Sequence, residues 1–285
     1  MIKPIVSPEW LKENINDPNL IVLDASQQTN IVGTSEFANL TIPNARNIDL
    51  KDGFSDKSTD LPNMLPNPEQ FEEAARGIGI SNSSKIVVYD NLGVYTSPRV
   101  WWMFKAMGHE DIAVLNGGLP AWIAKGYTTE VKSPVNHPIG NFTSSYNESM
   151  VKSFSCVEAN IKNKKYLLVD ARSTGRFNGT APEPREGILS GHIPNSINIP
   201  YENVLENGSF KSKEKLIKVF DKAKVDDRPL IFSCGSGITA CILLLASEII
   251  GRKDASVFDG SWTEWAEKTQ NLIIKTFEST RNNKT

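Results

Sequence analysis

Short, uninterrupted apolar runs alternate with amphipathic stretches along this chain of 285 residues. Residues 21–23, 86–89 and 113–115 are apolar without a polar break, which is typical of strands covered on both faces of a parallel sheet. Residues 68–76 and 97–107 have the pattern of intervening helices. The pattern predicts an α/β fold with a mainly parallel sheet and helices on both of its faces.

The same series of motifs occurs twice. The paired segments are 20–25 with 166–171, 42–45 with 193–196, and 85–90 with 229–234. Because the offsets are close to half the chain length, the repeat indicates a duplicated domain rather than a short-period solenoid. A polar, proline-bearing stretch separates the copies. We therefore expect an N-terminal domain at 1–132, a linker at 133–149 and a C-terminal domain at 150–285.

Composition narrows the range of partners. The net charge is −2, so no general attraction to nucleic acid is expected. No apolar run approaches the ~20 residues that span a bilayer, and the first residues lack the apolar segment of a signal peptide. Three cysteines form an odd, sparse set that is typical of reduced thiols. These features predict a cytoplasmic protein that binds no membrane. The cysteine and histidine spacing predicts no metal site, and no other cofactor is expected.

Cys234 is the strongest candidate for a reactive residue in this sequence. An apolar run at 229–233 precedes it and a second run at 240–246 follows, so the pattern places it at a turn from strand to helix. This is the sheet edge at which α/β proteins bind ligands. The helix dipole and the free amides at a helix start would stabilise a thiolate there, which predicts a nucleophile. The alternative is a buried structural cysteine. The matching position in the first half is Asp90.

The residues after Cys234 predict a cradle for an anionic sulfur. Gly235 and Gly237 let the backbone curl, and the amides from Ser236 onward, including those of Ile238 and Thr239, would face the sulfur. The Ser236 hydroxyl could also bond the substrate or relay a proton, with helix capping as an equal alternative. For Thr239, capping is the favoured interpretation.

Four motifs together with this duplicated layout resemble the two-domain rhodanese family over almost the whole chain. They are the segments 170–173 (Asp-Ala-Arg-Ser), 191–194 (Gly-His-Ile-Pro), 234–239 (Cys-Gly-Ser-Gly-Ile-Thr) and 259–265 (Asp-Gly-Ser-Trp-Thr-Glu-Trp). The resemblance implies tandem rhodanese-like domains, of which the first is catalytically silent and the second holds the nucleophile. The cysteine loop is similar to that of the mercaptopyruvate sulfurtransferase branch, because it lacks the basic residues usual in the thiosulfate branch.

The resemblance implies that sulfur moves from 3-mercaptopyruvate, through a persulfide on Cys234, to a thiol acceptor or cyanide, with release of pyruvate. The thiol acceptor could be a thioredoxin-like protein. Arg176 and Arg185, interpreted as loop residues, are the implied clamps for the donor carboxylate. Alternatives are a thiosulfate donor and a persulfide carrier that acts on a protein partner. A cysteine phosphatase is disfavoured, because Ala240 stands where its phosphate-binding arginine would be.

Three further residues have expected roles that bear on the site. Related enzymes are proposed to use a first-domain histidine in a proton relay, and this chain has Asn63 where that histidine is expected. Water or Ser236 would then have to protonate the leaving group. His192 is expected to make structural hydrogen bonds rather than act as a base, and Cys241 is expected to be buried and inert.

Overall fold

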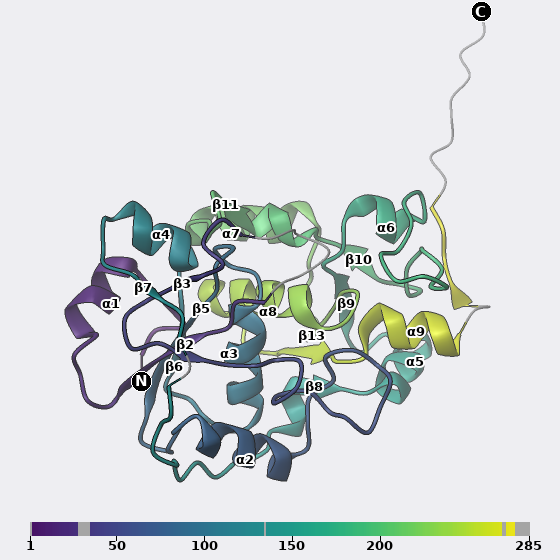
Figure 1. Ribbon diagram of the computed structural model, residues 1–285. Helices are drawn as coiled ribbons and strands as arrows, with labels where there is room; N and C mark the ends of the chain where they lie inside the picture. Colours follow the sequence, from purple (N-terminus) through teal and green to yellow (C-terminus); the bar gives the residue numbers. More distant parts are fainter. Residues whose placement is uncertain (1, 28–34, 134, 270–271, 277–285) are drawn as a thin grey trace, which may run out of the picture.

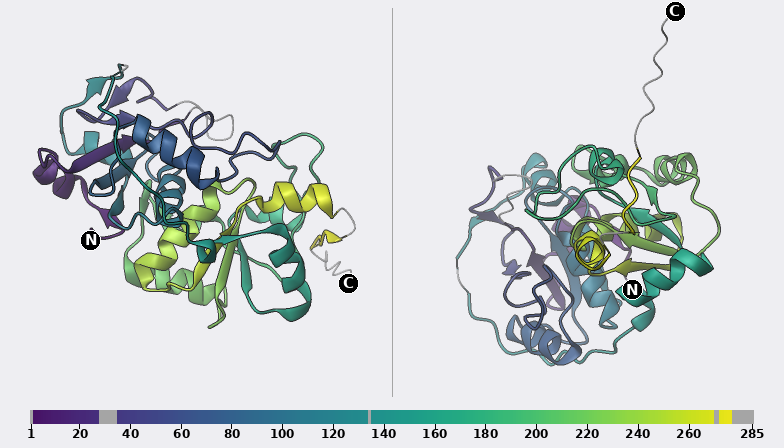
Figure 2. Two further views of the ribbon diagram at one scale, coloured as in Figure 1. Left: turned by 90° about the horizontal axis from the view of Figure 1, so that it is seen from below. Right: turned by 90° about the vertical axis from the view of Figure 1, so that its right-hand side faces the viewer.

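The computed structural model describes residues 2–27, 35–133, 135–269 and 272–276. The two halves of the chain form separate α/β units that lie side by side (Figure 1). Figure 2 shows the same arrangement from two other directions, with the first half in purple and blue and the second in green and yellow. The expected duplication is therefore visible in three dimensions.

The first unit has one main sheet. Its strands are β1 (Ile5–Val6), β2 (Leu20–Asp24), β4 (Arg46–Asn47), β5 (Lys85–Tyr89) and β6 (Ile112–Leu115). They pair in parallel in the order β1-β6-β5-β2-β4. The other elements are α1 (Pro8–Asn14), α2 (Pro68–Gly77), α3 (Ser97–Ala106), α4 (Gly118–Ala124) and an antiparallel pair of β3 (Leu40–Thr41) with β7 (Glu130–Val131).

The second unit repeats this plan. Its main strands are β8 (Val151–Lys152), β9 (Leu167–Asp170), β10 (Ile197–Asn198), β13 (Leu230–Ser233) and β14 (Ala255–Phe258), parallel in the order β10-β9-β13-β14-β8. Its helices are α5 (Phe154–Asn163), α6 (Thr174–Asn178), α7 (Lys213–Lys222), α8 (Ile238–Ile250) and α9 (Ser261–Lys268). The shorter elements are η1 (Glu148–Met150), η2 (Tyr201–Val204), β11 (Leu205–Glu206) and β12 (Ser209–Phe210).

Helices cover both faces of each sheet, which explains the unbroken apolar runs. In β2, Ile21 and Leu23 join one core cluster while Val22 joins another on the opposite face. Successive strand residues point to opposite faces, so a strand with two covered faces must be apolar throughout. The predicted strands and the parallel α/β fold are confirmed.

The units meet through equivalent helices. Helix α3 packs against α8, and one core cluster contains Val100 and Phe104 of α3 together with Leu243 of α8. Each helix follows the central strand of its own sheet, β5 or β13. The loops that precede the two helices therefore both lie at the interface. No described helix is long and apolar enough to cross a bilayer.

Candidate active site

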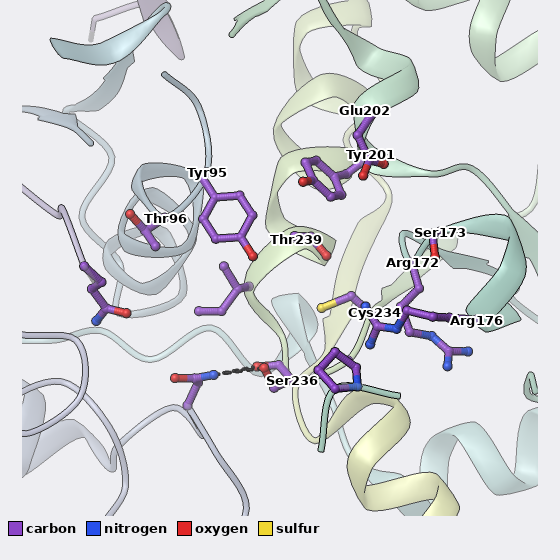
Figure 3. A pocket seen from close by; sticks show the side chains of 15 residues that line it. Tyr95, Thr96, Arg172, Ser173, Arg176, Tyr201, Glu202, Cys234, Ser236 and Thr239 are labelled. Carbon is purple, nitrogen blue, oxygen red and sulfur yellow. Dashed lines mark hydrogen bonds between the residues drawn. The ribbon is translucent and has the colours of Figure 1, made fainter. Parts of the chain in front are cut away.

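Cys234 lies directly after β13, at the carboxyl edge of the second sheet. Its amide donates to the Ser261 hydroxyl at 3.1 Å, which fixes the backbone at the strand end. The residue is only 2% exposed, yet it lines a cavity of about 370 Å³. Figure 3 shows the sulfur pointing into that cavity, between the two units. The thiol is therefore sheltered from bulk solvent but accessible to a small molecule.

The loop after Cys234 lines this cavity with Gly235, Ser236, Ile238 and Thr239. Gly237 has a φ of 80° and precedes α8, whose start has no side-chain cap; a positive φ of this kind favours glycine. The first-turn amides of α8 have no carbonyl partner within the helix. The expectation that Thr239 caps the helix is wrong, because its side chain lines the cavity beside Ile238 instead. Gly237 shapes the loop without lining the cavity.

In the first unit, the equivalent loop between β5 and α3 binds the carboxylate of Asp90. Its Oδ2 atom accepts hydrogen bonds from the amides of Tyr95 at 2.9 Å, Thr96 at 3.0 Å and Ser97 at 2.9 Å. The carboxylate thus occupies an amide cradle between a central strand and the following helix. Because Asp90 and Cys234 occupy equivalent positions, the comparison supports an anion-binding role for the Cys234 loop. In the first unit these three amides already bind the Asp90 side chain, so they are not available to an external anion.

Arg176 lies beside the cysteine loop. It belongs to the short helix α6, so its expected place on a loop is wrong. A Cβ atom added at Gly235 would lie 2.9 Å from its Nη2 atom, and glycine is what permits this approach. Glu183 accepts from its Nε at 3.0 Å and its Nη2 at 2.5 Å. Glu183 also accepts from Arg172, which is in turn paired with Asp170. This network orients the Arg176 guanidinium.

Arg185 does not join the cavity lining. Its side chain is 46% exposed, and its nearest carboxylate is that of Glu267, at 3.9 Å. Its neighbour Pro184 does line the cavity, so the loop passes close to the site while the guanidinium points outward. The proposed contact of Arg185 with a donor carboxylate stays a prediction, and it requires a rotation of this side chain toward the cavity.

The cavity walls come from both units. The lining side chains not yet placed are Gln27, Asn63, Tyr95, Thr96, Ser173, Tyr201, Glu202 and Ser236. Sequence reasoning missed Tyr95 and Tyr201 as site residues. Tyr201 follows β10 in η2, and a search of the residues after each parallel strand would have found it. Tyr95 reaches the site only through the packing of one unit on the other.

Asn63 lies where the implied histidine was expected to reach the cysteine loop. Its Nδ2 atom donates to the Ser236 hydroxyl oxygen at 3.0 Å and to the Ser236 carbonyl at 3.4 Å. A side-chain amide does not gain or lose a proton at neutral pH, so Asn63 can orient Ser236 but cannot relay a proton. Ser236 accepts this bond and keeps its own O–H available to a substrate.

His192 and Cys241 were expected to have structural rather than catalytic roles, and both lie outside the cavity lining. His192 forms a 2.9 Å hydrogen bond between Nδ1 and the Phe177 carbonyl and stacks on the Phe177 ring at 4.0 Å, and it is not part of the cavity lining. Cys241 is fully buried, and burial raises the pKa of its thiol to about 12. Neither residue is placed to act on a bound substrate.

Comparison with known proteins places this site in a family. The family model described as a rhodanese-like domain matches residues 7–125 and 153–268. Human 3-mercaptopyruvate sulfurtransferase is 37% identical, over 93% of this chain and 92% of that protein. Rat thiosulfate sulfurtransferase is 39% identical over the same shares of the two chains.

The solved structures give the same result. The crystal structure of the 3-mercaptopyruvate sulfurtransferase SseA from Escherichia coli superimposes with a TM-score of 0.81 at 33% identity. The match covers 92% of this chain and 99% of that one. The two matched domains and the relatives at 37% and 39% identity agree. The chain belongs to the rhodanese family, as a two-domain sulfurtransferase.

Proposed function

We propose that this enzyme takes sulfur from 3-mercaptopyruvate, holds it as a persulfide on Cys234 and passes it to a thiol acceptor. The observation that carries the proposal is the position of Cys234 in the loop between β13 and α8, inside a cavity that the Arg176 guanidinium reaches. An arginine fork matches a carboxylate, and a helix start stabilises an anionic sulfur. The cavity therefore offers the two functions that a mercapto acid requires.

The reaction divides into two displacements at sulfur. The Cys234 thiolate attacks the sulfur of the donor, so that an S–S bond forms and the C–S bond breaks. The bonding electrons leave on the donor carbon as the enolate of pyruvate, which takes up one proton. In the second step an acceptor thiolate attacks the outer sulfur and receives it, and the Cys234 thiolate is restored. The acceptor could be a small thiol, cyanide or a thioredoxin-like protein.

Thiosulfate is the competing donor, and the similarity to rat thiosulfate sulfurtransferase favours testing it. Thiosulfate carries two negative charges in a compact group. The loop after Cys234 offers little positive charge to neutralise these two charges, because residues 235–239 have no charged side chain, and Glu202 adds a carboxylate to the cavity lining. This balance of charge supports 3-mercaptopyruvate as the preferred donor.

Mass spectrometry tests the proposal directly. The wild-type protein and Cys234→Ser are mixed with 3-mercaptopyruvate or with thiosulfate, and the intact protein and its peptides are weighed. We expect the wild type to gain one sulfur on the peptide that contains Cys234, faster with 3-mercaptopyruvate, and the variant to gain none. Faster loading from thiosulfate would reverse the donor assignment, and sulfur on another cysteine would reject Cys234.

A further inference from the structure

The departing enolate needs a proton, and Asn63 cannot supply one. Among the cavity side chains, the Thr96 hydroxyl donates to the Ala25 carbonyl at 2.7 Å and is occupied. Ser173, Ser236 and Thr239 are alcohols, which are much weaker acids than a phenol, and the Gln27 amide does not lose a proton at neutral pH. Glu202 is exposed to solvent on η2. The two tyrosines of the cavity are the remaining donors.

Tyr95 is the better placed of these two. It is 7% exposed, and Figure 3 shows its hydroxyl pointing into the cavity from the first unit, across from the Cys234 sulfur. Displacement at sulfur is collinear, so the donor carbon leaves on the side of the sulfur remote from Cys234. That side faces the first unit. No side chain or carbonyl in the described part of the chain forms a hydrogen bond with the Tyr95 hydroxyl.

Tyr95 is held in this position by the loop of the first unit that contains Asp90 and is equivalent to the Cys234 loop. Its amide donates to the buried Asp90 carboxylate, and its ring packs edge-on against Tyr201 with centroids 5.9 Å apart. Burial raises the pKa of Tyr95, and the charges of Tyr201 and Cys234 raise it further. The hydroxyl therefore stays protonated at neutral pH. Proton transfer remains downhill, because an enolate carbon is a far stronger base than a phenolate.

We propose that Tyr95 is the acid that protonates the methylene carbon of the departing enolate, so that the first domain supplies a catalytic residue to the cysteine of the second. This inference rests on the proposed function. As the C–S bond breaks, its electron pair takes the phenol proton and forms the methyl group of pyruvate. The donor's own thiol proton stays on the outer sulfur of the persulfide. When the persulfide later ionises, solvent returns a proton to the Tyr95 phenolate.

The test compares Tyr95→Phe with Tyr201→Phe and, as a matched control, Tyr127→Phe, whose ring packs on Trp122 outside the cavity. Single-turnover loading of Cys234 from 3-mercaptopyruvate is followed by quenched mass spectrometry. Loading should slow by roughly 10²-fold or more in Tyr95→Phe, as expected for loss of a general acid, and stay unchanged in Tyr127→Phe. Discharge of the loaded persulfide to dithiothreitol needs no carbon protonation and should keep its wild-type rate in Tyr95→Phe.

Each other result has a distinct meaning. Unchanged loading in Tyr95→Phe would assign the proton to water or Ser236 and overturn the proposal. A larger loss in Tyr201→Phe would move the role to that residue. Equal slowing of loading and discharge would reduce Tyr95 to a packing role. If the wild type itself gains no sulfur from 3-mercaptopyruvate, the proposed function fails, independently of Tyr95.

Discussion

Arg99 and Asp259 form an ion pair of 2.7 Å across the interface of the two domains, with side chains only 1% and 4% exposed. Arg99 lies in α3 of the first domain, and Asp259 follows β14 of the second. The same guanidinium donates to the Gly237 carbonyl at 3.3 Å and to the Asn63 carbonyl. Asp259 also accepts from the Leu65 amide at 2.7 Å. One buried pair thus joins the cysteine loop to the first-domain loop that contacts Ser236.

Arg99→Met should destabilise the protein, because it leaves the Asp259 carboxylate buried without its countercharge. The expected loss is about 3–5 kcal/mol of unfolding free energy, measured by urea denaturation. Lys215→Met, which removes an exposed pair with Glu206, is the control and should cost less than about 1 kcal/mol. Equal effects of the two variants would show that the buried pair has no special structural role.

Gly235→Ala should impair the use of 3-mercaptopyruvate more than it impairs folding. The new Cβ would lie 2.9 Å from the Arg176 Nη2 atom, so the guanidinium must shift from its position beside the cysteine loop. We expect kcat/KM to fall by about 1.5–3 kcal/mol in equivalent free energy, the range for one hydrogen bond to a charged group. Gly77→Ala, where an added Cβ meets nothing within 4 Å, should leave steady-state kinetics unchanged. A normal kcat/KM in Gly235→Ala would remove Arg176 from donor binding.

Cys241 should resist alkylation in the folded protein. Burial raises the pKa of its thiol to about 12, so the reactive thiolate is scarce at pH 8. Iodoacetamide at that pH should modify Cys234, which lines the cavity, and modify Cys241 only after urea is added. Peptide mass spectrometry distinguishes the two sites, and Cys241→Ala should keep sulfur-transfer activity. Comparable labelling of both cysteines in the native state would contradict this arrangement.

The unfolding free energy should fall as the pH drops below about 6.5, the usual pKa of histidine. Burial lowers the pKa of His109, which packs against the Phe104 and Phe142 rings, and that of His192. In the window below 6.5 the unfolded chain binds protons that the folded one excludes, so acid favours unfolding. Urea denaturation at pH 7.5 and 5.5 measures the difference. His109→Gln should reduce this pH-dependent difference in unfolding free energy. The same difference in the variant and the wild type would assign the effect to other groups.

Much of the fold follows from local pattern. The apolar runs at 21–23, 86–89 and 113–115 became β2, β5 and β6 because both faces of the sheet are covered. The repeated motifs indicated two similar domains, which the matched family segments confirm. The turn from strand to helix at Cys234 was also predictable, since its glycines and flanking apolar runs lie within a few residues of one another.

The composition of the site was less accessible to sequence reasoning. Arg176 was expected on a loop but belongs to α6, which is too short to give a clear helical period. Thr239 was expected to cap α8, but the loop turns at Gly237 and leaves Thr239 facing the cavity. The expected contact of Arg185 with a donor carboxylate stays a prediction, and its side chain lies near Glu267 rather than in the cavity lining. In each case the direction of a side chain depends on packing that no short motif encodes.

The sequence by itself therefore determined the main strands and helices, the duplication and the turn from strand to helix at Cys234, because these depend on periodicity and on neighbours along the chain. Only the tertiary structure decided that Tyr95 faces Cys234 and that Arg99 pairs with Asp259. Both relationships arise where α3 packs on α8, between residues far apart in the chain. Such contacts form when two apolar helix faces are buried together, and that docking sets which polar side chains share the enclosed cavity.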